Sequence, residues 1–214
     1  MEDADERVVL SGEPDALEPW YELNFGQMHA YAIRSTDASD LAPPPDDVRV
    51  RLATEADVAV MEAASEVIWR EQLRAPSWSP FLPERVEPNR SEYVALLTTP
   101  EDETVWVAED AVSGEALGAC LAYPLGPDLD IPERNLKLTG AGTFEAARRR
   151  GVSRALVHAV LEHARSQDVP CCVLDWRTSS LLASRAWPAL GWRRTRIRLE
   201  RQIDERIAWA DGRW

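Results

Sequence analysis

A run of arginines around one glycine is the part of this sequence best suited to bind an anion. It reads Arg148-Arg149-Arg150-Gly151-Val152-Ser153-Arg154 and opens the strongest amphipathic helix pattern of the chain. A helix N-terminus presents unpaired N–H groups and the positive end of the helix dipole, and a glycine there lets a phosphate approach the backbone. The segment predicts a pyrophosphate site, and the alternative is a solvated basic helix start.

A sheet flanked by helices has to position this segment. Apolar runs predict strands at residues 48–52, 104–108, 115–123, 136–143, 170–176 and 192–202. Helical spacing and end signals predict helices at residues 54–69, 91–97, 152–165 and 180–190. The predicted order is therefore β, α, α, β, β, β, α, β, α, β, with a hairpin between the second and third strands.

Two motifs in this order resemble the GNAT superfamily of acyl-CoA-dependent N-acyltransferases. Residues 148–153 are similar to its Arg/Gln-x-x-Gly-x-Gly/Ala signature, and residues 180–192 resemble its helix that ends in an aromatic residue, a leucine and Gly-Phe. The order of elements over residues 48–202 is also that of the family. The resemblance implies an α/β (α+β) fold with a mixed, mostly antiparallel twisted sheet of about six to seven strands flanked by helices.

The resemblance also implies an activity and a cofactor site. The expected reaction is transfer of an acetyl group from acetyl-CoA, as co-substrate, to the primary amine of a small molecule or peptide in a direct ternary complex. The expected CoA contacts are Thr143, Arg148, Arg149, Arg150, Gly151, Val152, Ser153, Arg154 and Ser180.

Three residues depart from the family pattern. Ser153 stands where glycine or alanine is usual, and Ser180 stands where many members have asparagine. Trp187 stands where a tyrosine often protonates the leaving thiolate, and an indole N–H cannot serve as that acid. A degenerate member that binds acyl-CoA or a partner protein without turnover is the alternative function.

Acid–base candidates come from the strand ends beside the expected cofactor gap. Glu145 and Asp175 are the candidate bases and Tyr123 the candidate acid. Backbone N–H groups near residues 142–144 would polarise the thioester carbonyl if the strand is bulged there. The three histidines receive no catalytic role, and His29 is placed outside the main domain. Trp78 and Phe81, in the proline-rich loop of residues 75–83, are expected to line the acceptor side.

The first 34 residues look like a helix–strand remnant of a second unit of the same kind. Residues 16–25 align with residues 183–192, so that Trp20 matches Trp187 and Asn24 matches Gly191. A proline-rich linker follows at 35–47, then the transferase domain at 48–204 and a tail at 205–214. We expect the helix–strand unit to dock on the main sheet or on another subunit, which leaves a homodimer open.

Composition narrows the class of protein. With 45% hydrophobic and 29% charged residues, the 214-residue chain can bury a core. A net charge of −13 argues against nucleic acid as a partner, although residues 148–214 hold 14 basic against 7 acidic residues. No apolar stretch reaches membrane-spanning length, so we expect a cytoplasmic protein with no membrane partner. Three cysteines predict neither a disulfide framework nor a metal site.

Overall fold

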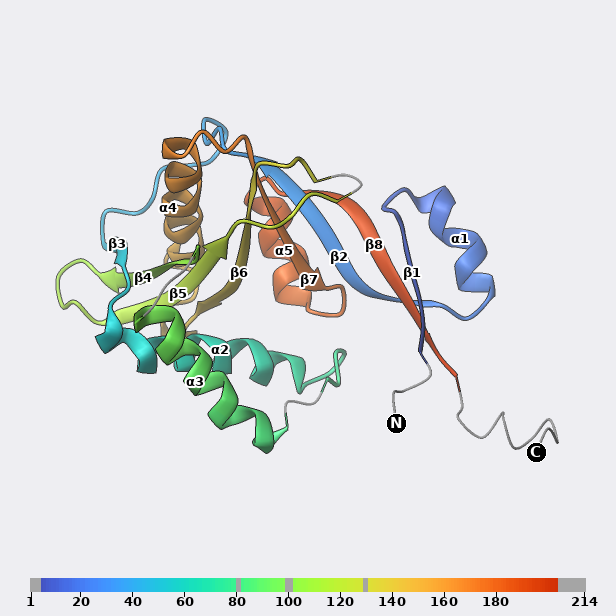
Figure 1. The fold of residues 1–214 in the computed structure, drawn as a ribbon, viewed down its shortest axis with the longest axis horizontal. Coiled ribbons are helices and arrows are strands. Elements are labelled where there is room, and N and C mark those ends of the chain that lie inside the picture. Colours follow the sequence, from blue (N-terminus) through green and yellow to red (C-terminus); the bar gives the residue numbers. More distant parts are fainter. Residues whose placement is uncertain (1–4, 80–81, 99–101, 129–130, 204–214) are drawn as a thin grey trace.

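The computed structural model describes residues 5–79, 82–98, 102–128 and 131–203, which form one eight-stranded sheet with five α-helices (Figure 1). The strands are β1 (Asp5–Ser11), β2 (Gly26–Ser35), β3 (Val48–Leu52), β4 (Thr104–Asp110), β5 (Ala116–Tyr123), β6 (Asn135–Thr143), β7 (Cys171–Arg177) and β8 (Arg193–Gln202). The helices are α1 (Pro14–Glu22), α2 (Val58–Gln72), α3 (Val86–Thr98), α4 (Val152–Ser166) and α5 (Leu181–Ala189).

The sheet order is β1-β8-β2-β7-β6-β5-β4-β3. All neighbouring strands are antiparallel except β6 and β7, which are parallel. The mixed, mostly antiparallel α/β fold expected from the sequence is confirmed. Three features differ: the sheet has eight strands, β1 was not predicted, and α3 begins five residues earlier than expected.

The core lies on both faces of the sheet. Val105 and Val107 of β4 cluster with Met61 of α2, whereas the alternate residues Trp106 and Ala108 belong to the larger cluster that includes α4. This alternation follows from the period-2 side-chain geometry of a strand. Helices α2 and α3 therefore cover one face over β5 and β6, and α4 covers the other (Figure 1). In the described residues, no helix is long and apolar enough to cross a bilayer.

The N-terminal segment forms part of this sheet. Strand β2 lies between β7 and β8, and its Ala30 and Ala32 are buried in the larger core cluster. The chain from β2 to β3 then crosses α4, where Ala42 O accepts a hydrogen bond of 2.8 Å from His158 Nε2 and Thr36 N donates to Pro170 O at 3.2 Å. Residues 36–47 are thus bonded to the sheet and to α4 along their course.

Residues 5–35 and 171–202 form two strand–helix–strand units related by an approximate two-fold axis. The axis passes between β2 and β8 at the pair Ala30↔Ile197. It relates the residue pairs on one side of this centre to those on the other. Gly26↔Glu200 thus corresponds to Ile33↔Arg193, and His29↔Arg198 corresponds to Tyr31↔Arg196. Strand β1 beside β8 then corresponds to β7 beside β2.

The helix ends of the two units are also alike. Phe25 N donates to Trp20 O and Trp192 N donates to Trp187 O, both at 3.1 Å. Each pair of rings packs edge to face, at centroid distances of 5.3 Å and 6.2 Å. Asn24 and Gly191 both have positive φ, +63° and +82°. The sequence alignment of residues 16–25 with residues 183–192 therefore corresponds to the same local structure.

Candidate active site

The N-terminus of α4 is open. Its first helical hydrogen bond runs from Ala155 N to Gly151 O at 3.0 Å, so the N–H groups of Val152, Ser153 and Arg154 precede the bonded part of the helix. Gly151 precedes the helix with φ +78° and provides no capping side chain. Such an end is a ready-made binding place for an anion.

The arginines before this helix do not share one role. Arg150 Nη2 binds Asp47 Oδ2 at 2.8 Å and Asp110 Oδ2 at 2.7 Å, and its N–H bonds to Ala147 O. Backbone hydrogen bonds from the β4–β5 turn, together with Arg150, hold the pKa of Asp110 well below its usual range, so both groups stay charged. Arg150 is thus bonded to carboxylates of the protein.

Beside the helix start, β6 and β7 separate. They pair only where residues 135–137 meet residues 171–173, and no further pairs follow toward Thr143. Within β6, the register with β5 shifts between Gly142 and Thr139, which places a bulge at residues 140–141. A bulge was the condition for polarisation of a carbonyl at residues 142–144, and the structure has one two residues earlier. A gap between parallel strands thus leads from the helix start into the sheet.

The α4 side of this gap is lined by small hydroxyl groups and one indole. Thr143 Oγ1 and Ser153 Oγ lie 3.0 Å apart and, with Trp187, border a cavity of about 10 Å³. Ser180, expected to contact CoA, is the N-cap of α5, and its Oγ accepts a hydrogen bond from Ala183 N. Trp187 therefore lies on the α4 side of the gap, where it lines the same small cavity as Thr143.

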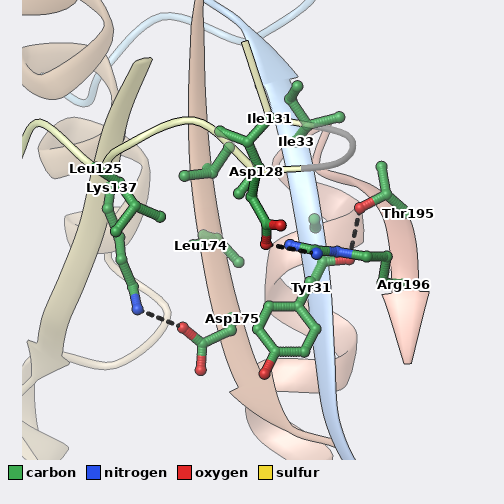
Figure 2. A pocket seen from close by; sticks show the side chains of 12 residues that line it. Tyr31, Ile33, Leu125, Asp128, Ile131, Lys137, Leu174, Asp175, Thr195 and Arg196 are labelled. Atoms are coloured by element: carbon green, nitrogen blue, oxygen red, sulfur yellow. Dashed lines mark hydrogen bonds and ion pairs between the residues drawn. The ribbon is translucent and has the colours of Figure 1, made fainter. Parts of the chain in front are cut away.

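The opposite face of the sheet carries a row of polar side chains across four adjacent strands. Tyr123 on β5 lies directly opposite Lys137 on β6, and Lys137 Nζ binds Asp175 Oδ1 on β7 at 2.9 Å (Figure 2). Asp175 Oδ2 accepts a hydrogen bond from His29 Nδ1 on β2 at 3.1 Å. His29 therefore lies within the sheet, which corrects its predicted position outside the main domain.

These ion pairs fix the charge of Asp175. Burial opposes its ionisation, but the hydrogen bonds from His29 and Lys137 outweigh burial and lower the pKa of Asp175 to about 2. In the same pair, burial opposes the charge of Lys137 and the bond to Asp175 raises the pKa of Lys137. A carboxylate whose pKa is lowered in this way is a weaker base. The role of Asp175 as the base stays a prediction.

A cavity of about 110 Å³ lies on the same face, beside Asp175 (Figure 2). Its walls are mostly apolar, and the chain from β5 to β6 contributes Leu125 and Ile131. Arg196 crosses the cavity to Asp128 and lies over the ring of Tyr31, 5.1 Å from its centroid. Sequence patterns missed this cavity because Tyr31 comes from a segment that was assigned to another unit.

Comparison with known proteins identifies the family. The model of the Acetyltransferase (GNAT) family matches residues 68–192. The chain belongs to the GNAT acetyltransferase family. The matched segment runs from α2 to Trp192 and so includes the arginine run, the gap and both motifs. A search of curated proteins found no match.

Solved GNAT structures resemble the chain in fold. A GCN5-related N-acetyltransferase from Sphaerobacter thermophilus has 15% identity and a TM-score of 0.63, and covers 94% of this chain, which spans 60% of that protein. One from Kribbella flavida has 15% identity and a TM-score of 0.54, and the match covers 94% of this chain and 70% of that one. A predicted acetyltransferase from Clostridium acetobutylicum, solved with acetyl-CoA, has 13% identity and a TM-score of 0.53, and the match covers 68% of this chain and 90% of that one. Matches over 94% of the chain take in most of the N-terminal unit.

The other predicted site residues of this GNAT chain lie apart. Glu145 is exposed in the short turn of residues 145–147, on the way to α4. Trp78 is 72% exposed, and the loop that carries it is joined to the segment after β7 by Ser77 Oγ and Ser179 Oγ, 2.8 Å apart. Phe81 lies outside the described residues. In the described residues, no three His, Cys, Asp or Glu side chains gather as metal ligands.

Proposed function

We propose that this protein transfers an acetyl group from acetyl-CoA to the primary amine of a small molecule or peptide in a direct ternary complex. The observation that supports this most is the open N-terminus of α4 beside the gap between β6 and β7. An anion site next to a gap between parallel strands suits a ligand with a pyrophosphate at one end and a thin arm at the other. The family supports the acetyl donor.

The residues present fit acetyl-CoA. The N–H groups of residues 152–154 would bind the pyrophosphate, with the charge of Arg149 nearby, and the edge of β6 at Thr143 would pair with the pantetheine amides. The bound cofactor supplies an activated acetyl thioester. The bulge at residues 140–141 frees backbone N–H groups from the β5–β6 ladder, and a thioester carbonyl beside them would be polarised.

Replacing Gly151 with valine tests the anion site. At φ +78° a side chain is strained, and a Cβ would lie 3.1 Å from both Pro45 Cγ and Arg154 Nη2. We expect Gly151→Val to weaken acetyl-CoA binding about 100-fold or more, measured by titration calorimetry, with the circular dichroism spectrum retained. Gly126→Val is the matched control, because a Cβ at Gly126 meets no atom within 4 Å. Unchanged affinity in Gly151→Val would contradict the site.

A second candidate is an acyl-CoA-binding protein without turnover. Trp187 favours it, because an indole on the cofactor side of the gap cannot protonate a leaving thiolate. The two candidates differ in one assay. Acetyl transfer to any member of a panel of primary amines, followed by thiol release, supports the transferase, whereas acetyl-CoA binding with no transfer to any amine supports the binding protein.

A further inference from the structure

We propose that the face of β2 and β7 opposite α4 is the acceptor site and that His29 is the base that takes the proton of the acceptor amine. This inference rests on the proposed acetyltransferase function. His29 lies outside residues 68–192, the segment that carries the family match. Its strand, β2, is the neighbour of β7 and brings the imidazole to the same face as Asp175.

The contact with Asp175 fixes the state of the imidazole. Asp175 is anionic and can only accept hydrogen bonds, so in neutral His29 the proton lies on Nδ1, which donates to Asp175 Oδ2 over 3.1 Å. Nε2 then carries the lone pair. Nε2 is buried and has no hydrogen-bond partner among the described residues. A buried acceptor without a donor is unfavourable, and an amine N–H of the acceptor supplies the missing donor.

One charged group holds Asp175, and two more lie on the strands beside His29. Lys137 binds the second oxygen of Asp175 at 2.9 Å and so orients the carboxylate (Figure 2). Arg177 on β7 and Arg198 on β8 lie directly opposite His29 on its two flanking strands. An aspartate that orients an imidazole and stabilises the imidazolium formed during proton transfer is a recurring catalytic arrangement.

The pair lies at the mouth of the gap. Asp175 is two residues beyond Val173, the last residue of β7 that pairs with β6, so it is located where the strands have begun to separate. Thr178, just after β7, bonds to Met28 O and to Gln27 O, which ties the start of β2 to the end of β7. A thioester in the gap and an amine on this face therefore meet beside His29.

The cavity beside the pair indicates the class of acceptor. Its volume is about 110 Å³, and its charged lining residues are paired with one another, as Arg196 with Asp128 and Lys137 with Asp175. The remaining lining by Ile33, Leu125, Ile131 and Val173 suits a short apolar or aromatic group. Asp175 lines the cavity and is bonded to His29, so the imidazole lies one side chain away from the cavity. We infer that the acceptor is a small primary amine with its apolar group in the cavity and its nitrogen at His29.

The proton transfer balances as follows. His29 Nε2 takes one proton from the ammonium group, and the freed lone pair forms the C–N bond to the acetyl carbon while the C–S bond breaks. The departing sulfur leaves as the thiol with the second proton lost by the nitrogen. The products are the N-acetyl amide, free CoA and an imidazolium on His29, which Asp175 stabilises until the proton passes to solvent.

The test uses the full chain with acetyl-CoA and phenethylamine. We expect His29→Gln to lower kcat about 100-fold or more, to leave the acetyl-CoA Kd unchanged and to remove the acid limb of the kcat/KM–pH profile. Asp175→Asn, which changes a positioning residue, should lower kcat by a smaller factor and keep that limb. His158→Gln is the matched control, because His158 bonds to Ala42 O on the α4 side and should retain wild-type kinetics.

A second measurement needs no variant. Long-range ¹⁵N–¹H spectra of the wild-type protein should show neutral His29 with its proton on Nδ1, and phenethylamine should shift the Nε2 resonance. An Nε2–H tautomer, or wild-type kinetics and pH profile in His29→Gln, would overturn the role of His29 while transfer by the wild type leaves the proposed function standing. Transfer to spermidine but not to phenethylamine would overturn the apolar acceptor. A wild type that binds acetyl-CoA yet acetylates no amine would overturn the proposed function and this inference together.

Discussion

The two strand–helix–strand units have the same backbone arrangement but different side chains on the sheet face opposite α4. In β7–α5–β8 and β1–α1–β2 the helices end in the same hydrogen bonds and the same edge-to-face ring pair. On the open face, however, Asp175 of β7 binds two partners, whereas the equivalent residue of β1 is Val9, which is 46% exposed. A repeated backbone therefore does not repeat a site. Strand β6, which carries Lys137, lies beside β7 only, and the position of His29 on β2 is occupied by Arg196 on β8.

The first unit as a whole provides the hardest test of this comparison. Removing residues 1–35 takes away β1, α1 and β2 and leaves β8 without either neighbour. Because total stability is about 5–15 kcal/mol, loss of a central strand should prevent folding. We expect the truncated chain to aggregate or to lack a cooperative thermal transition by calorimetry. A soluble truncated chain with the wild-type Tm would show that the N-terminal unit does not contribute to the stability of the rest of the domain.

Gly191 after α5 and Asn24 after α1 occupy equivalent positions, but exchanging glycine and asparagine at these positions should change the free energy of unfolding by different amounts. A Cβ at Gly191 would lie 1.5 Å from Arg34 Nη1, and the Arg34 side chain is buried and paired with Asp40. Gly191→Asn should therefore lower the free energy of unfolding by about 2 kcal/mol or more. Asn24→Gly, at the equivalent position, should change it by less than about 0.5 kcal/mol. Urea denaturation measures both, and equal losses would mean that the two helix ends are packed alike.

Acid titration separates the two open faces. The pKa of Asp175 is lowered from 3.8 to about 2, so its contribution is complete above pH 4 and is lost as the pH falls from about 4 to about 2. Asp175→Asn should remove about 2 kcal/mol of unfolding free energy at neutral pH and flatten the stability curve in that window. Val9→Asn, at the equivalent position of β1, should leave the slope unchanged. A slope retained in Asp175→Asn would show that other carboxylates cause it.

The smallest effect concerns a loop that is bonded to the segment after β7. Trp78 is 72% exposed and its loop is joined to Ser179 through Ser77. Trp78→Ala should change unfolding free energy by no more than about 0.5 kcal/mol. If the ring contacts the acceptor, the acceptor KM should rise about fivefold, which corresponds to about 1 kcal/mol. Steady-state kinetics decide, and lower stability with an unchanged KM would make Trp78 a structural residue.

Sequence patterns correctly predicted the features that are formed by residues close together in the chain. The arginine run predicts the open helix start because Gly151 and the first turn of α4 are contiguous, and the capping pair Thr54 and Asp57 predicts the start of α2 in the same way. The fold followed from the order of elements. Strand β1 was missed because its first three residues are charged, which hides the period-2 pattern in Val8–Ser11.

The proposed acceptor face was not predictable because it depends on long-range pairing. His29 and Asp175 are 146 positions apart, and no property of either segment states that β2 inserts beside β7. The proline run before β3 is typical of a spacer, so it favoured two separate units, whereas the chain there crosses α4 under hydrogen bonds. Asp175 was a candidate base because of its place at a strand end beside the gap, and the sequence could not show that His29 and Lys137 bind it and lower its pKa.

The insertion of β2 between β7 and β8 also sets the order in which the protein can be completed during synthesis. Both neighbours of β2 are made near the end of the chain. At about 5–20 residues per second, the ribosome finishes β7 roughly 7–30 seconds after β2. During that time β2 has neither of its neighbouring strands. A nascent chain that stalls before residue 171 therefore exposes an unpaired apolar strand to which chaperones can bind.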